Sequence, residues 1–140
     1  AYEGGAHAYH ATLPTDGLLQ LRDAINEAEA VGFAALKSAQ ASLGQRVRQM
    51  LAQRGIQSVA APGFEAPGVV VSYAPAPDVQ NGKRFAAIGL QIASGVPLQC
   101  DEPAGFSTFR LGLFGLDKLA DIEGTVTVLQ DALDAAGLTA

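Results

Sequence analysis

The chain has 140 residues, 49% of them apolar and 16% charged, which is enough to bury one hydrophobic core. Its formal net charge of −5 comes from acidic residues scattered among nine Lys and Arg, and no basic run could neutralise a row of phosphates. No apolar run approaches the roughly 20 residues that span a bilayer, and the N-terminus lacks the charged and apolar regions of a signal peptide. We therefore expect neither a nucleic-acid partner nor a membrane partner.

The cysteine and histidine content argues against disulfides and zinc. Cys100 is the single cysteine, so no intrachain disulfide can form, and Cys100 with His7 and His10 matches no zinc-ligand spacing. A reducing cytoplasm and no metal site are the expectation. Because the chain starts Ala-Tyr-Glu-Gly-Gly without an initiating Met, we expect it to be a fragment of a longer protein.

The first half of the chain predicts two helices. Residues 1–16 are rich in Gly, Ala and polar groups and form an irregular leading segment. From Leu18 to Val31 apolar residues recur at the spacing of an amphipathic helix. A second stripe in the same period runs from Leu36 to Met50, and Arg54-Gly55 supplies the basic last turn and glycine typical of a helix end.

The period then changes to that of strands. Residues 57–60 and 68–73 are short, contain β-branched residues and are bounded by Pro and Gly, as strands are. After residues 75–78 we expect a short helix to about Gly89, followed by a strand over 90–93.

The last segment predicts one strand and one helix. Residues 107–113 are expected to form the strand, and Asp117 is expected to cap a helix that continues to Gly137. The resulting order, about ααββαββα, predicts an α+β fold in which helices cover a small, mostly antiparallel sheet.

Two short segments carry groups suited to binding an anion. In the first, Tyr9 and Thr12 place a phenol and a hydroxyl three residues apart before a helix, where both could donate to a phosphate. The alternative is an ordinary surface loop in which Thr12 helps to cap the next turn. In the second, Arg110 lies on an apolar strand next to glycines, and its planar guanidinium could hold a carboxylate through two parallel hydrogen bonds. The alternative is an arginine at the sheet edge that reaches water or a structural carboxylate.

The order of motifs resembles one enzyme family. Tyr-His-x-Thr-x-Pro from Tyr9, a helix starting Leu-Leu-x-Leu-Arg-Asp-Ala, a Val-Val-Val strand and Phe-Arg-Leu-Gly-Leu-Phe-Gly from Phe109 follow one another over essentially the whole chain. This pattern is similar to the C-terminal small domain of class V, fold-type I aminotransferases that depend on pyridoxal 5'-phosphate, the alanine-glyoxylate and serine-glyoxylate aminotransferase group.

The resemblance implies roles for three residues. Tyr9 and Thr12 would reach across a homodimer interface to the cofactor phosphate of the neighbouring subunit, and Arg110 would bind the α-carboxylate of the substrate. Residues 1–16 would connect from a large domain outside this chain, and residues 17–140 would be the small domain.

The resemblance also implies what this chain lacks. In the family it resembles, the catalytic lysine, the acidic partner of the pyridine nitrogen and the aromatic stacking residue belong to the large domain. Lys37, Lys83 and Lys118 match no lysine motif of that family. The chain alone is therefore expected to be inactive, with no catalytic residue of its own. The whole enzyme would move an amino group from alanine or serine to a 2-oxo acid such as glyoxylate or pyruvate.

One segment departs from the family pattern. Residues 93–105 replace a glycine-rich run that commonly precedes the arginine strand, which puts the identity of the substrate in doubt. Cys100 and Asp101 could face the site, but a loop cysteine is more often simply tolerated. Two other interpretations stay open: a free-standing α+β module that binds a small carboxylate through Arg110, and a lyase or desulfurase of the same fold.

Overall fold

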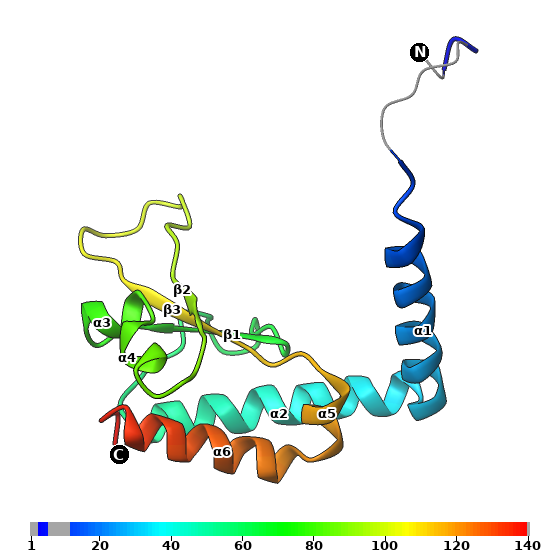
Figure 1. Ribbon diagram of the computed structural model, residues 1–140. Coiled ribbons are helices and arrows are strands. Elements are labelled where there is room, and N and C mark those ends of the chain that lie inside the picture. Colours follow the sequence, from blue (N-terminus) through cyan, green and yellow to red (C-terminus); the bar gives the residue numbers. More distant parts are fainter. Residues whose placement is uncertain (1–2, 6–11, 140) are drawn as a thin grey trace. The chain divides into compact units, whose positions relative to one another are not determined.

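The computed structural model describes residues 3–5 and 12–139 (Figure 1). The chain divides into two compact units, residues 1–33 and residues 34–140. One helix lies in the first unit, and the sheet and the other helices lie in the second. Within these described residues, no helix combines the length and the apolar character needed to cross a membrane.

Helix α1 (Thr15–Val31) forms in the first unit where the apolar stripe predicts it. It begins after Pro14 without a side-chain cap, and it ends at Gly32, whose φ of 97° lies in the region that favours glycine. None of its residues is buried. The exposed fractions of its large apolar side chains include Leu18 46%, Leu21 55%, Ile25 48% and Val31 55%.

This uncovered stripe predicts self-association of the isolated chain, because contiguous exposed apolar surface favours contact with another molecule. We expect the mean mass measured by sedimentation to rise with protein concentration. Replacing Leu21 and Ile25 together by Lys should reduce that rise. The matched control, Asn26 and Ala30 replaced by Lys on the opposite side of the helix, makes the same change in charge and should leave the rise in place. A strictly monomeric chain over a wide concentration range contradicts this prediction.

The second unit contains a three-stranded antiparallel sheet in the order β1-β3-β2. Strand β3 (Thr108–Gly112) is central, between β1 (Val69–Tyr73) and the short β2 (Ala93–Ser94). Arg110 pairs with Val71 on one side and Ala93 on the other. The predicted α+β class and the small antiparallel sheet are confirmed.

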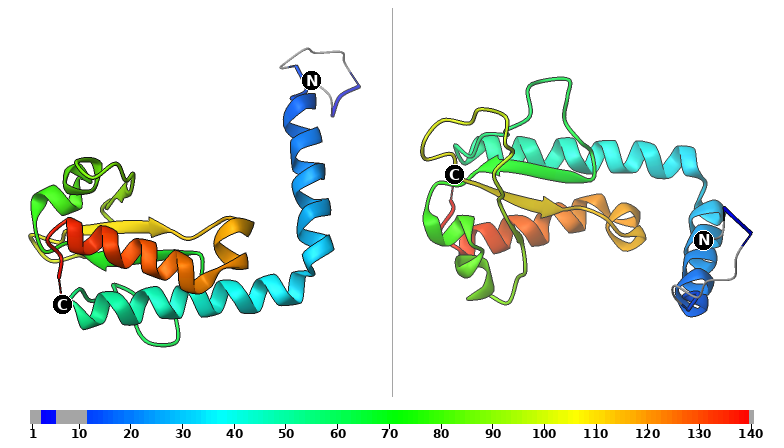
Figure 2. Two further views of the ribbon diagram at one scale, coloured as in Figure 1. Left: turned by 60° about the horizontal axis from the view of Figure 1, so that its bottom comes forward. Right: turned by 90° about the horizontal axis from the view of Figure 1, so that it is seen from above.

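Two long helices cover one face of this sheet (Figure 2). Helix α2 (Phe33–Gln53) and helix α6 (Ile122–Ala135) lie side by side and are joined by ion pairs, including Arg54 Nη2 to Asp134 Oδ1 at 2.7 Å. Their inward apolar side chains meet alternate residues of β1 and β3, as the strand period requires. The shared core includes Leu43, Val47, Leu51, Val70, Phe109, Leu111, Val126 and Leu133.

Between β1 and the end of the chain, two predicted helices are each divided into two pieces. The helix expected up to Gly89 is α3 (Pro77–Gln80) and α4 (Lys83–Ala86), because the chain turns at Gly82 with a φ of 77°. The last helix is α5 (Leu116–Ala120) and α6, since Asp121 Oδ1 accepts from the Gly124 N–H and starts a new helix. The expected cap at Asp117 is wrong, because this residue lies inside α5.

The predicted strand over residues 57–60 is reduced to an isolated bridge between Ser58 and Ser72. The Val59 N–H bonds to the Val71 carbonyl oxygen at 3.0 Å, but the chain reaches Pro62 before a longer ladder can form. The observed order is therefore ααβααββαα instead of ααββαββα.

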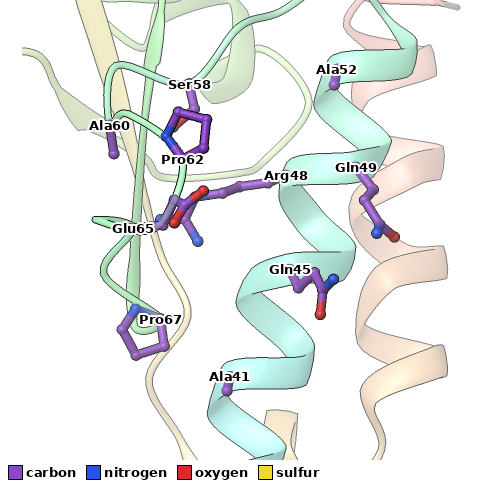
Figure 3. A pocket seen from close by; sticks show the side chains of 10 residues that line it. All are labelled: Ala41, Gln45, Arg48, Gln49, Ala52, Ser58, Ala60, Pro62, Glu65 and Pro67. Carbon is purple, nitrogen blue, oxygen red and sulfur yellow. The ribbon is translucent and has the colours of Figure 1, made fainter.

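Arg48 connects α2 to the loop that precedes β1. Its Nη2 donates to the carbonyl oxygens of Ala66 at 2.7 Å and Val69 at 3.1 Å, and its Nη1 donates to the Gly44 carbonyl oxygen at 3.3 Å. Burial lowers the pKa of the Arg48 guanidinium, and the nearby carboxylate of Glu65 opposes that shift. The side chain therefore spans the space between helix and loop, as Figure 3 shows.

Candidate functional site

Arg110 lies on the face of the sheet that α2 and α6 leave open. Because side chains alternate along a strand and its neighbours Phe109 and Leu111 are buried in the core, Arg110 points to the opposite face. The register places the following residues on the same face: Val69, Val71, Tyr73, Ala93, Thr108, Arg110 and Gly112.

The guanidinium of Arg110 has one hydrogen bond within the described part of the chain. Its Nε donates to the backbone carbonyl oxygen of Ser94 at 3.1 Å, and no described carboxylate forms an ion pair with it. Every other arginine either pairs with a carboxylate or, in the case of Arg48, donates to backbone carbonyls. The ion pairs are Arg22–Asp23, Arg46–Glu123, Arg54–Asp134 and Arg84–Asp78.

These contacts bear on two parts of the alternative in which Arg110 is a structural group. The strand is central, so Arg110 is not at a sheet edge, and among the described residues no structural carboxylate compensates its charge. The guanidinium of Arg110 is half-buried, and its two Nη groups have no partner among the described residues. Its parallel N–H donors are suited to binding a planar anion such as a carboxylate.

The 93–105 segment begins directly beside this arginine. Ala93 pairs with Arg110, and Gly95 packs so closely on β3 that an added Cβ would overlap the carbonyl and hydroxyl oxygens of Thr108. The Gln80 Nε2 donates to the Gly95 carbonyl oxygen at 3.4 Å. The start of this segment, Ala93 to Gly95, is therefore held next to the strand that carries Arg110.

A hollow of about 360 Å³ lies under this segment. Its lining includes Gln80, Val96, Glu102, Phe106 and Thr108. Strand alternation places Thr108 on the same face as Arg110, two residues before it. The open face of the sheet is thus bordered by a space of small-molecule size.

Glu102 gives the tip of this segment its shape. Its carboxylate accepts from the backbone N–H groups of Gln99 and Cys100, both at 2.8 Å, and from that of Leu98. Gln99 and Asp101 have φ angles of 59° and 62°, a region that non-glycine residues seldom adopt. Cys100 is exposed on this turn.

Acid should loosen this turn. Backbone N–H groups, first its own and then that of Cys100, donate to the carboxylate and hold the pKa of Glu102 below its ordinary value of 4.5. A lowered folded-state pKa means that the stabilisation is complete above 4.5 and is lost as the pH falls through the folded-state pKa. We expect the amide proton signals of Gln99 and Cys100 to titrate in that acid range by NMR. In Glu102→Gln that titration should disappear, and its persistence in the variant contradicts the assignment.

The expected phosphate-binding pair is described only in part. Thr12 is exposed in the segment before α1, and Tyr9 lies outside the described residues. Thr12 belongs to the first unit and Arg110 to the second.

The three lysines lie on helices of the second unit, and none of them lies on the strand that carries Arg110. Lys37 is exposed on α2, Lys83 is exposed on α4, and Lys118 on α5 lies 3.6 Å from Asp117. Across residues 3–5 and 12–139, no group of three His, Cys, Asp or Glu is placed to hold a metal ion. The planar guanidinium of Arg110 is a group suited to binding an anion.

A second hollow, of about 740 Å³, lies between α2 and the loop before β1 (Figure 3). Arg48 and Glu65 project into it, and the remaining lining is mainly Ala, Gln and Pro. Arg48 is already bonded to backbone carbonyls there, so we assign this hollow to the connection between helix and loop.

The motif pattern points to residues 93–105 as the segment before the arginine strand, but it does not predict the hydrogen bonds and packing of Ser94, Gly95 and Gln80. Their only local signal is the Ser94-Gly95 dipeptide at the end of an apolar run, which is too short to identify a strand partner. No protein-family model matches the chain, and no curated protein matches it either. The likeness to class V aminotransferases therefore rests on the motifs themselves.

Proposed function

We propose that this chain is the C-terminal small domain of a pyridoxal-phosphate-dependent aminotransferase of class V. The enzyme moves an amino group from a small amino acid, of the alanine or serine type, to a 2-oxo acid such as glyoxylate or pyruvate. The observation that supports this most is the half-buried Arg110 on the open face, whose two Nη groups have no partner among the described residues. A guanidinium in that state suits the carboxylate common to both substrates.

The cofactor is held mostly by residues outside this chain. Thr12 offers one hydroxyl of a type that fits a phosphate oxygen, and Tyr9 would offer a phenol beside it. When bound, the cofactor supplies the electron withdrawal that labilises bonds at the α-carbon of the amino acid. Arg110 binds and orients the carboxylate so that this carbon is presented in one geometry.

The proposal includes two partners and a compartment. The large domain of the same polypeptide would cover part of this chain. The second partner would be another copy of the protein in a homodimer, in which Tyr9 and Thr12 of each subunit contact the cofactor phosphate of the other. The cytoplasm is the proposed location, since the exposed thiol of Cys100 suits a reducing compartment.

Replacing the phosphate donors tests the cofactor assignment. In the full-length protein, Tyr9→Phe with Thr12→Val should weaken binding of pyridoxal phosphate by about 1–3 kcal/mol, the usual cost of charge-assisted hydrogen bonds left unmade. Cofactor affinity is measured by absorbance titration after removal of the bound cofactor. His10→Ala, between the two donors, is the control and should bind normally. Unchanged affinity in the double variant removes both residues from the site.

The function is tested by comparing the full-length protein with the 140-residue chain. The full-length protein should bind pyridoxal phosphate and transfer the amino group of alanine or serine to glyoxylate or pyruvate. The chain alone should form no stoichiometric borohydride-stable adduct at Lys37, Lys83 or Lys118, and it should transfer no amino group. Such an adduct in the chain, or a full-length protein without transaminase activity, contradicts the proposal.

Two alternatives predict different products in the same assay. A lyase or desulfurase of the same fold would consume the amino acid without forming a new one from the 2-oxo acid. A free-standing carboxylate-binding module would bind the acid through Arg110 and convert nothing.

A further inference from the structure

Within the described residues, the guanidinium of Arg110 donates one hydrogen bond, from Nε, and this bond decides which edge of the guanidinium stays available to a ligand. A guanidinium can offer a carboxylate either the edge formed by Nε and one Nη, or the edge formed by both Nη atoms. The Ser94 carbonyl oxygen accepts from Nε at 3.1 Å and so occupies the first edge. The edge formed by Nη1 and Nη2 has no acceptor among the described residues.

The Ser94 carbonyl is itself held in place by the sheet. Ser94 pairs with Phe109, the residue before Arg110, in the β2–β3 ladder. The next residue, Gly95, packs against the backbone of Thr108 at a distance that only a residue without Cβ allows. The Gln80 side chain holds the Gly95 carbonyl from α3.

We infer that the Ser94 carbonyl, seated by Gly95 and Gln80, is a positioning group that makes Arg110 take a carboxylate end-on through Nη1 and Nη2. This inference rests on the proposed carboxylate-binding role of Arg110 and specifies how that role is performed. A backbone acceptor fixes the plane of the guanidinium before the ligand arrives, which lowers the loss of rotamer freedom on binding. Gly95 and Gln80 act through Arg110 and do not touch the carboxylate.

The first test needs no ligand and uses the isotope-labelled 140-residue chain. The Arg110 Nε–H should exchange with solvent more slowly than the Nε–H of Arg46, an exposed arginine whose Nε has no acceptor among the described residues. Gly95→Ala should speed up the exchange of the Arg110 Nε–H, because its hydrogen bond to Ser94 is disturbed. Gly17→Ala should not, because the added Cβ there makes only an ordinary van der Waals contact with Pro14. An Arg110 Nε–H that exchanges as fast as the Nε–H of Arg46 in the unsubstituted chain overturns the inference.

The second test adds acetate at constant ionic strength. Acetate should shift the Nη signals of Arg110 and leave its Nε–H signal nearly unchanged. A shift centred on Nε–H overturns the end-on geometry alone. Absence of any acetate effect at Arg110 overturns the carboxylate role, and with it both this inference and the proposed function.

In the full-length enzyme, a change in KM without an equal change in kcat separates a positioning role from a structural one. Gly95→Ala should raise KM for the amino acid by at least about tenfold with a much smaller change in kcat, because it weakens carboxylate binding. Gln80→Met is the milder variant should Gly95→Ala fail to fold, and it should raise KM about two- to fivefold. Gln91→Met, the same change at an exposed glutamine, is its control. The positioning role is overturned if kcat falls by the same factor as KM rises, or if neither variant changes KM.

Discussion

Replacing Arg110 by Ala in the full-length enzyme should lower kcat/KM for the amino acid about 100-fold or more, as loss of a bidentate ion pair of a few kcal/mol implies. Arg110→Lys keeps the charge but loses the fork, so it should lower kcat/KM at least about tenfold. Cofactor binding should survive both changes. The measurement is steady-state kinetics with alanine and serine as donors.

Two controls separate carboxylate binding from a structural role of Arg110. Arg46→Ala, which removes an exposed arginine paired with Glu123 on the other side of the sheet, should leave kcat/KM nearly unchanged. An amine substrate without a carboxylate should be used about equally by the unsubstituted enzyme and by Arg110→Ala. If the substitution slows this amine as much as it slows the amino acid, Arg110 is structural and the assignment is wrong.

Arg48→Met should lower the free energy of unfolding by about 2–3 kcal/mol, because carbonyl oxygens of Ala66 and Val69 lose their donor while the aliphatic stem is kept. The loss is smaller than the sum of three charged hydrogen bonds, since the variant also avoids the cost of burying the charge, the same burial that lowers the pKa of Arg48. Urea denaturation followed by circular dichroism measures it.

Arg46→Met is the matched control for this stability change. Arg46 lies on the same helix, but its pair with Glu123 is exposed, so its replacement should change the free energy of unfolding much less. Equal losses in the two variants would mean that α2 is destabilised in general and that the Arg48 hydrogen bonds to the loop contribute nothing specific.

The sequence predicts most of the elements of this protein because their signals are local. The stripes of α1 and α2 repeat within a few residues, and the β-branched run at Val69 to Val71 follows a Pro-Gly turn. Errors occur where a single residue competes with the periodic pattern. Gly82 and Asp121 each interrupt a stripe that the period alone would continue.

Of the candidate site, the sequence predicts one residue, Arg110. Arg110 stands out because it is the cation in an apolar strand between Phe109 and Leu111. Its environment is not predictable in the same way, because Ser94 lies sixteen positions away and Gln80 still further. Only the pairing of β2 with β3 brings Ser94 beside the guanidinium, and Gln80 contacts this segment through its hydrogen bond to the Gly95 carbonyl oxygen.

By itself, the sequence determined the α+β class, the approximate positions of the long helices and strands, and the presence of an arginine on an apolar strand. The tertiary structure alone decided that β3 is the central strand, that Arg110 faces away from α2 and α6, and that its Nε is occupied by Ser94. The physical reason is the range of the interactions. Helix and strand preferences act over a few neighbouring residues, whereas strand order and the partner of a side chain depend on which distant segments pack together to bury one core.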